Sequence, residues 1–134
     1  RSDEFVTKKI INHCKLIKEK KLKNLQLGDV NVYRDWGWAP EYVKAMYLML
    51  RYKDTRDFVI GSGKRYSLKT FVYEVFKLLK IPKKFLKVNS KKLIRKNDIK
   101  SYQADPRLAK KLLKWKPKIT FKQIVYKMVN DQLY

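Results

Sequence analysis

Apolar residues recur every three to four positions in four stretches of the chain, and a fifth stretch, 40–51, is almost continuously apolar. Together these stretches predict five helices at 5–20, 40–51, 67–79, 105–115 and 120–129. In four of these stretches the apolar residues form one inner face, with lysines on the other side. The expected inner-face residues are Phe5, Val6, Ile10, Cys14 and Ile17, then Phe71, Val75, Leu78 and Leu79, then Leu108, Leu112 and Leu113, and finally Ile124, Val125, Met128 and Val129.

Helix-starting residues stand where these patterns begin. Pro40 is acceptable in a first helical turn, and Ser67 is a good N-cap. Asp105 and Pro106 are expected as the N-cap and first residue of the fourth helix, and residues 120–123 (TFKQ) fit a Thr-x-x-Gln capping box.

Three short apolar segments, 25–28, 57–63 and 85–88, are expected to be strands, and 57–63 ends in a glycine turn. The alternation of short strands with helices predicts a helix-rich α/β fold. These strands are too few and brief for a self-contained doubly wound sheet.

The helix expected at 40–51 has almost no polar face, because Lys44 alone interrupts the apolar run at 42–50. A surface helix normally pairs an apolar stripe with a polar face. Two explanations are open: the helix is the centre of a small bundle, or part of the fold that covers it is missing from the chain.

The charge of the chain is unusual for its length of 134 residues. It carries 34 Lys and Arg against 12 Asp and Glu, a net charge of +22, with a pI of about 10.1. This balance suits a polyanion partner such as nucleic acid, and it also suits a plain lysine-rich surface. Lysine far outnumbers arginine in this chain, whereas proteins that read nucleic-acid sequence rely on arginine for paired hydrogen bonds to the bases.

The side chains exclude several classes of site. A single cysteine, Cys14, excludes an intramolecular disulfide, and with the single histidine, His13, it cannot make a usual zinc site. No signal peptide and no apolar run of membrane-spanning length are seen, so a cytoplasmic location is expected. The chain opens without methionine and is interpreted as a fragment.

No active site is visible from the residues alone. The segment GSGKRYS (61–67) lacks the GxxxxGK[ST] spacing of a P-loop, so a simple turn is expected. Arg34 could hold a diphosphate or form an ion pair with Asp35, and the same two interpretations are open for Arg95 and Asp98.

Four segments in one order resemble the C-terminal, substrate-binding half of the GDP-mannose 4,6-dehydratases, a family of extended short-chain dehydrogenases/reductases. They are FVTKKI, LGDVNVYRDWGWAPEYVKAMYLML, DFVIGSG with YSLKTFV, and DPRLAKKLLKWKPKITFKQIVYKMV. The resemblance covers nearly the whole chain, which is therefore interpreted as one nucleotide-sugar-binding domain, 1–134. Its implied fold is the C-terminal part of an NAD(P)-binding Rossmann enzyme, with the Rossmann half absent.

The resemblance also implies an activity, in which the complete enzyme converts GDP-mannose to GDP-4-keto-6-deoxymannose with bound NADP. The missing N-terminal half would bind NADP and carry the catalytic residues, so this chain supplies none. The complete enzyme is expected to be a homo-oligomer without membrane or nucleic-acid partners. A non-catalytic domain that binds polyanions or nucleic acid is the alternative.

Five residues match family positions that bind the nucleotide. Val6 and Lys9 correspond to guanine contacts, Arg34 and Arg95 to diphosphate ligands, and Asp98 to a ribose-contacting Glu. Arg1 and Thr7 fall near the same site.

The chain also departs from the family. Lys96 stands in place of a proline beside Arg95, Trp38 in place of a histidine, and Lys114 in place of a glycine. In the family, the helix at 40–51 packs between the substrate and Rossmann domains, which would explain its apolar surface.

Overall fold

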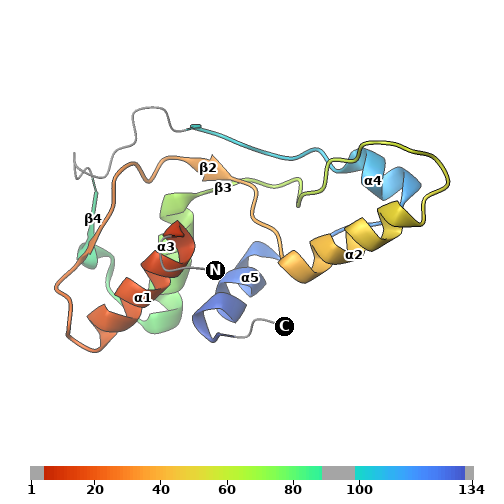
Figure 1. The fold of residues 1–134 in the computed structure, drawn as a ribbon. Helices are drawn as coiled ribbons and strands as arrows, with labels where there is room; N and C mark the ends of the chain where they lie inside the picture. Colours follow the sequence, from red (N-terminus) through yellow and green to blue (C-terminus); the bar gives the residue numbers. More distant parts are fainter. Residues whose placement is uncertain (1–4, 89–98, 132–134) are drawn as a thin grey trace.

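The structure, a computed structural model, describes residues 5–88 and 99–131. Within these ranges it contains five α-helices, one 3₁₀ helix and four two-residue strands (Figure 1). Their bounds are α1 (Val6–Lys18), β1 (Leu25–Gln26), β2 (Tyr33–Arg34), α2 (Ala39–Leu50), β3 (Tyr66–Ser67), α3 (Leu68–Leu79), η1 (Lys83–Phe85), β4 (Leu86–Lys87), α4 (Arg107–Leu112) and α5 (Phe121–Val129). The helix-rich α/β character predicted from the sequence is confirmed.

The main core forms where α1, α3 and α5 pack together (Figure 1). Each helix contributes its apolar face, including Ile10 and Cys14 from α1, Phe71 and Val75 from α3, and Val125 from α5, all at most 1% exposed. Burying side chains of this size contributes about 1.5–3 kcal/mol each before conformational entropy is subtracted. This core therefore accounts for most of the apolar burial in the fold.

Local capping fixes where two of these helices begin. The Ser67 hydroxyl accepts the N–H of Thr70 at 3.1 Å at the start of α3. At the start of α5, Thr120 and Gln123 form the reciprocal capping box expected from the sequence. Both caps satisfy backbone donors that a helix start leaves unpaired.

The strands form two short ladders between segments far apart in sequence. β1 pairs with β4 in parallel, with Leu25 opposite Leu86. β2 pairs with β3 antiparallel, with Arg34 opposite Tyr66, and an isolated parallel bridge joins Tyr33 to Ser101 on the other side of β2. β2 is thus the middle of three adjacent segments.

A second, smaller cluster joins α2 to α4 and Trp115, away from the main core (Figure 1). Ala45, Ala109, Leu113 and Trp115 are its buried members. Glu41 of α2 connects this cluster to the segment before α5, because its carboxylate accepts the N–H of Lys118 at 2.6 Å.

Among the described residues, only one side of α2 packs against other parts of the chain. Val43, Met46, Tyr47 and Leu50 are 63%, 59%, 55% and 87% exposed. These residues have i, i+3, i+4 and i+7 spacing, so they form one stripe along the helix. We call these four residues the α2 stripe; it is an apolar surface open to solvent.

The strand predicted at 57–63 is wrong, because none of these seven residues pairs in a ladder. Phe58 and Ile60 pack against the second cluster, while Val59 is 51% exposed. The segment has strand-forming side chains, but a strand also needs a neighbouring strand to satisfy its backbone.

Four inner-face predictions are also wrong. Phe5, the N-cap residue, and Val6, the first residue of α1, are 52% and 43% exposed, and the next residue, Thr7, is the buried one. Leu78 and Leu108 are exposed as well, and Ala109 takes the buried place in α4. Helical spacing gives the period of an apolar face but leaves its centre uncertain by about one residue.

The fourth helix starts one residue later than predicted. α4 begins at Arg107, with Pro106 at the N-cap position. The carboxylate of Asp105 accepts the Arg107 N–H at 3.1 Å, so Asp105 still satisfies a backbone donor at the helix start.

Candidate functional site

Arg34 projects from the middle segment of the three-segment ladder. Its Nη1 donates to the carbonyl oxygens of Tyr33 at 2.8 Å and of Ile99 at 2.6 Å. Two backbone hydrogen bonds join β2 to the segment 99–102. The Tyr33 N–H donates to the Lys100 carbonyl at 2.8 Å, and the Tyr102 N–H donates to the Tyr33 carbonyl at 3.1 Å. The guanidinium of Arg34 is therefore fixed relative to the segment 99–102, at a partly exposed position suited to a charged ligand.

The ion pair between Arg34 and Asp35, left open by the sequence, is not formed among the described residues. The Asp35 carboxylate instead accepts three backbone N–H groups, from Ser62 at 2.9 Å, Gly63 at 2.9 Å and Ala104 at 3.2 Å. Asp35 is thus a structural acceptor rather than the counterion of its neighbour.

Val6 and Lys9, the predicted guanine contacts, lie in the first half of α1, a different element from Arg34. Val6 is 43% exposed and Lys9 is partly exposed, so both side chains are accessible. The nearby Thr7 is buried. The predicted roles of Val6, Lys9 and Thr7 stay predictions.

Arg95 and Asp98, the predicted diphosphate and ribose contacts, lie outside the described residues, as does Arg1. Their predicted roles also stay predictions. The described part of the predicted site consists of Val6, Lys9 and Arg34.

The glycine turn after residue 60 does not offer a phosphate cradle. The N–H groups of Ser62 and Gly63, which such a cradle would use, both donate to Asp35. Gly63 has φ +74°, a left-handed conformation that favours glycine. The turn predicted here is confirmed, and its glycines serve backbone geometry.

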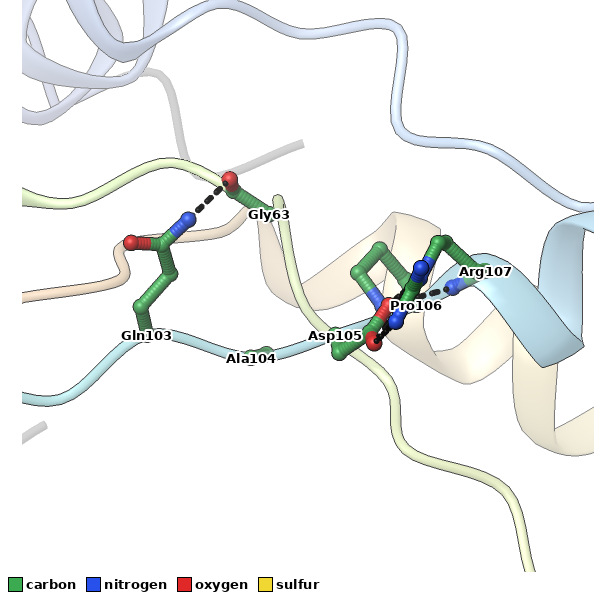
Figure 2. Close-up of a pocket in the computed structure, with 6 residues that line it drawn as sticks. All are labelled: Gly63, Gln103, Ala104, Asp105, Pro106 and Arg107. Carbon is green, nitrogen blue, oxygen red and sulfur yellow. Dashed lines mark hydrogen bonds and ion pairs between the residues drawn. The ribbon is translucent and has the colours of Figure 1, made fainter.

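A hollow of about 560 Å³ lies beside this turn and is lined by Gly63 and by residues 103–107. Figure 2 shows Gln103 reaching across to the Gly63 carbonyl, which accepts its Nε2 at 2.8 Å. On the other side of the hollow, Asp105 and Arg107 form an ion pair at 2.6 Å. These polar groups satisfy one another, so the chemistry of the hollow does not select a ligand.

Two groups have shifted pKa values: the Tyr42 phenol, close to Asp35, and the Asp29 carboxyl, paired with Lys100. The pKa of the Tyr42 phenol is raised to about 12, mainly by burial and in smaller part by the negative charge of the nearby Asp35 carboxylate. The Lys100 ammonium, 2.6 Å from Asp29, lowers the pKa of that carboxyl by hydrogen bonding. Lys100 belongs to the segment that holds Arg34, so this ion pair is a second tether on the segment.

The described ranges, 5–88 and 99–131, contain no group of three metal-ligating acidic, histidine or cysteine side chains. In the same part of the chain, no helix combines the length and apolarity needed to span a bilayer. The sequence-based expectation of no metal site concerns the whole chain and stays a prediction.

Several solved structures share this fold. The RMD of Pseudomonas aeruginosa, solved with NADPH, superposes with a TM-score of 0.85 at 18% identity, over 98% of this chain and 43% of that one. A dTDP-glucose 4,6-dehydratase of Bacillus anthracis, solved with NAD, superposes with a TM-score of 0.80 at 21% identity, over 97% of this chain and 39% of that one. These likenesses place the chain in one fold class with a part of each of these two proteins.

Within that class, the chain belongs to the GDP-mannose 4,6-dehydratase family, whose model matches residues 1–128. It is 33% identical to GDP-mannose 4,6 dehydratase 1 of Arabidopsis thaliana over 133 residues, which cover 99% of this chain and 37% of the relative. It is 34% identical to the human GDP-mannose 4,6 dehydratase over 149 residues, which cover 97% of this chain and 40% of the relative. The chain thus spans about two fifths of the length of these relatives.

The sequence did not reveal Asp35 and Glu41 as backbone acceptors. Asp35 stood out only as a neighbour of Arg34, and its three donors lie 27 to 69 residues away. Such partners carry no local signal, although an acidic residue at the end of a short strand is a candidate for this role.

Proposed function

We propose that this chain is the GDP-recognition part of a GDP-mannose 4,6-dehydratase. The family match over residues 1–128 carries the proposal. In the proposed division of labour, Val6 and Lys9 contact guanine, Arg34 and Arg95 bind the diphosphate, and Asp98 contacts the ribose. The complete protein would convert GDP-mannose to GDP-4-keto-6-deoxymannose in the cytoplasm.

Arg34 is the best-supported ligand residue in the described part of the site. Two carbonyl acceptors hold its guanidinium in one orientation, which limits the conformational entropy lost on binding. A planar guanidinium also matches the paired oxygens of a diphosphate.

The NADP that the family implies does not fit the described residues. The glycine turn that comes nearest to a phosphate loop has its Ser62 and Gly63 N–H groups occupied by Asp35. We therefore assign NADP to the remaining three fifths of the relatives' length, and we derive no hydride-transfer step from this chain.

The α2 stripe supports a second part of the proposal. In a complete enzyme, the N-terminal cofactor-binding domain would cover the stripe, as the family resemblance implies. We also propose that the complete enzyme is a homo-oligomer. The net charge of +22 would then be a solvated surface, and the comparisons support the dehydratase interpretation over a polyanion-binding domain.

The test is calorimetric titration of GDP, with guanosine as the ligand without phosphates, into the polypeptide as its source makes it. We expect Arg34→Ala to weaken GDP binding about 10- to 100-fold, as expected for a lost charge-assisted hydrogen bond. Arg56→Ala, a change at another exposed arginine, is the matched control and should leave the Kd unchanged. Equal GDP affinity in the Arg34→Ala variant would remove Arg34 from the site.

A further inference from the structure

The Asp35 carboxylate joins two segments that flank β2 on opposite sides. Its Oδ1 accepts the Ser62 N–H and its Oδ2 accepts the N–H groups of Gly63 and Ala104, at 2.9, 2.9 and 3.2 Å. An ionised carboxylate accepts hydrogen bonds without offering a donor, so one side chain can collect three N–H groups.

This arrangement extends the ladder beyond its last backbone pair. β2 pairs with β3 on one side, and Tyr33 pairs with the segment 99–102 on the other. One residue after Arg34, hydrogen bonds to the Asp35 side chain replace the backbone pairing on both sides of β2. The donors on one side precede β3, and the donor on the other side follows Tyr102.

Close packing around Asp35 leaves little room for these segments to shift. A Cβ added at Gly61 would overlap the Ala104 side chain and would lie 3.1 Å from Asp35 Oδ2. A second tie, from Gln103 Nε2 to the Gly63 carbonyl, joins the same two segments at 2.8 Å (Figure 2).

The segment that Asp35 anchors is also the one that holds Arg34. Ala104 follows the paired residues 99–102, and the carbonyl of Ile99 accepts Arg34 Nη1 at 2.6 Å. Asp35 is thus connected to the guanidinium of Arg34 through Ala104, the segment 99–104 and Ile99, in addition to the direct chain link.

From this connection we infer that Asp35 is a positioning residue for Arg34: its carboxylate fixes the segment 99–104, which in turn holds the guanidinium in place to bind a ligand diphosphate. The inference rests on the proposed function of Arg34. Asp35, the Asp of the Arg-Asp-Trp-Gly segment, thereby contributes to ligand affinity, although within the part of the chain that the structure describes no hydrogen bond or ion pair joins it directly to Arg34.

A double-mutant cycle tests this inference in the polypeptide as its source makes it, with GDP and guanosine titrated separately. We expect Asp35→Asn to weaken GDP binding about tenfold, since one amide oxygen cannot accept all three N–H groups in place of two carboxylate oxygens. The Kd for guanosine should not change. In the Arg34→Ala background, Asp35→Asn should produce no further loss, because the two changes remove one interaction.

The outcomes separate the two proposals. If Arg34→Ala leaves GDP binding unchanged, the proposed function of Arg34 fails whatever Asp35 does. If Arg34→Ala weakens GDP binding while Asp35→Asn has no effect, or weakens it equally in both backgrounds, Asp35 does not act through Arg34 and the inference is overturned.

A measurement on the unmutated protein covers the case in which Asp35→Asn does not fold. Because coupling between two sites is reciprocal, a ligand held by Arg34 should stabilise the hydrogen bonds to Asp35. We expect GDP, but not guanosine, to slow hydrogen exchange at the amides of Ser62, Gly63 and Ala104. Unchanged exchange at all three amides in the presence of saturating GDP would contradict the inference.

Discussion

The backbone carbonyl of Glu41 accepts a hydrogen bond from the indole N–H of Trp115 at 3.0 Å, across 74 residues of sequence. The side chain of the same glutamate accepts the N–H groups of Lys118 at 2.6 Å and Ile119 at 3.2 Å. Glu41 therefore fixes the start of α2 to the segment that leads into α5, and it links the second cluster to the main core.

Glu41→Ala should lower the free energy of unfolding by about 1–3 kcal/mol, because the N–H groups of Lys118 and Ile119 lose a charged acceptor. Urea unfolding followed by circular dichroism measures the change. Asp54→Ala, at an exposed acidic position outside the helices, should stay within about 0.5 kcal/mol of the unmodified protein. Equal effects of the two changes would show that the Glu41 contacts contribute nothing specific.

Lys80→Gly should stabilise the protein by about 0.5–1 kcal/mol. Lys80 ends α3 with φ 58°, a left-handed conformation that costs a residue with a Cβ and suits glycine. Lys77→Gly, three residues earlier and inside the helix, should destabilise by a similar amount. Both variants replace a lysine by glycine in the same region of α3. Shifts of the melting temperature in opposite directions would support the backbone explanation, and shifts in the same direction would refute it.

Stability should fall above about pH 9 through Cys14. Burial raises the pKa of this thiol from 9.0 to about 12. Between these values the unfolded chain loses the thiol proton while the folded chain keeps it, so stability present below pH 9 is lost as the pH rises towards 12. The slope from this group approaches about 1.4 kcal/mol per pH unit.

Urea titrations at several pH values measure that slope, and Cys14→Ala should remove the Cys14 contribution while lowering stability at pH 7. In the folded protein, Cys14 should also react slowly with a thiol reagent, because its side chain has no exposed surface. Rapid modification without unfolding would contradict the burial of this thiol.

The α2 stripe should make the 134-residue chain self-associate when its charge is screened. At an ionic strength of about 1 M the screening length is ~3 Å, so the net charge of +22 no longer opposes contact between apolar surfaces. Sedimentation velocity should show concentration-dependent association that Met46→Glu reduces. Lys44→Gln, on the same helix, alters the net charge by the same amount and should have little effect.

A chain that stays monomeric at high salt would show that the exposed stripe is not adhesive. Association weakened equally by Met46→Glu and Lys44→Gln would assign the effect to charge instead of apolar contact.

The sequence predicted the helices because their signals are local. Spacing of three to four residues and caps such as Ser67 and the Thr120–Gln123 box act within one or two turns, and the structure confirms both caps. The segment 57–63 also has a local strand signal, but pairing depends on a neighbour that its own residues cannot specify.

The candidate site was predictable only in part. Arg34 could be selected as a residue, since a rigid guanidinium at the edge of the apolar helix suits a diphosphate, but its orientation comes from the Ile99 carbonyl, 65 residues away. An ion pair with Asp35 was the open alternative, because the two residues are adjacent in sequence. The structure gives the two side chains different partners, backbone carbonyls for Arg34 and backbone N–H groups for Asp35.

The ladder around β2 has a consequence for the order of events during synthesis. Both neighbours of β2 come later in the chain, and Ile99 follows Arg34 by 65 residues. At ~5–20 residues per second the ribosome takes roughly 3–13 s to add this stretch. The arginine that we assign to the diphosphate is therefore made early and acquires its carbonyl acceptor late, so a nascent chain halted before residue 99 would lack the geometry on which the proposed GDP binding depends.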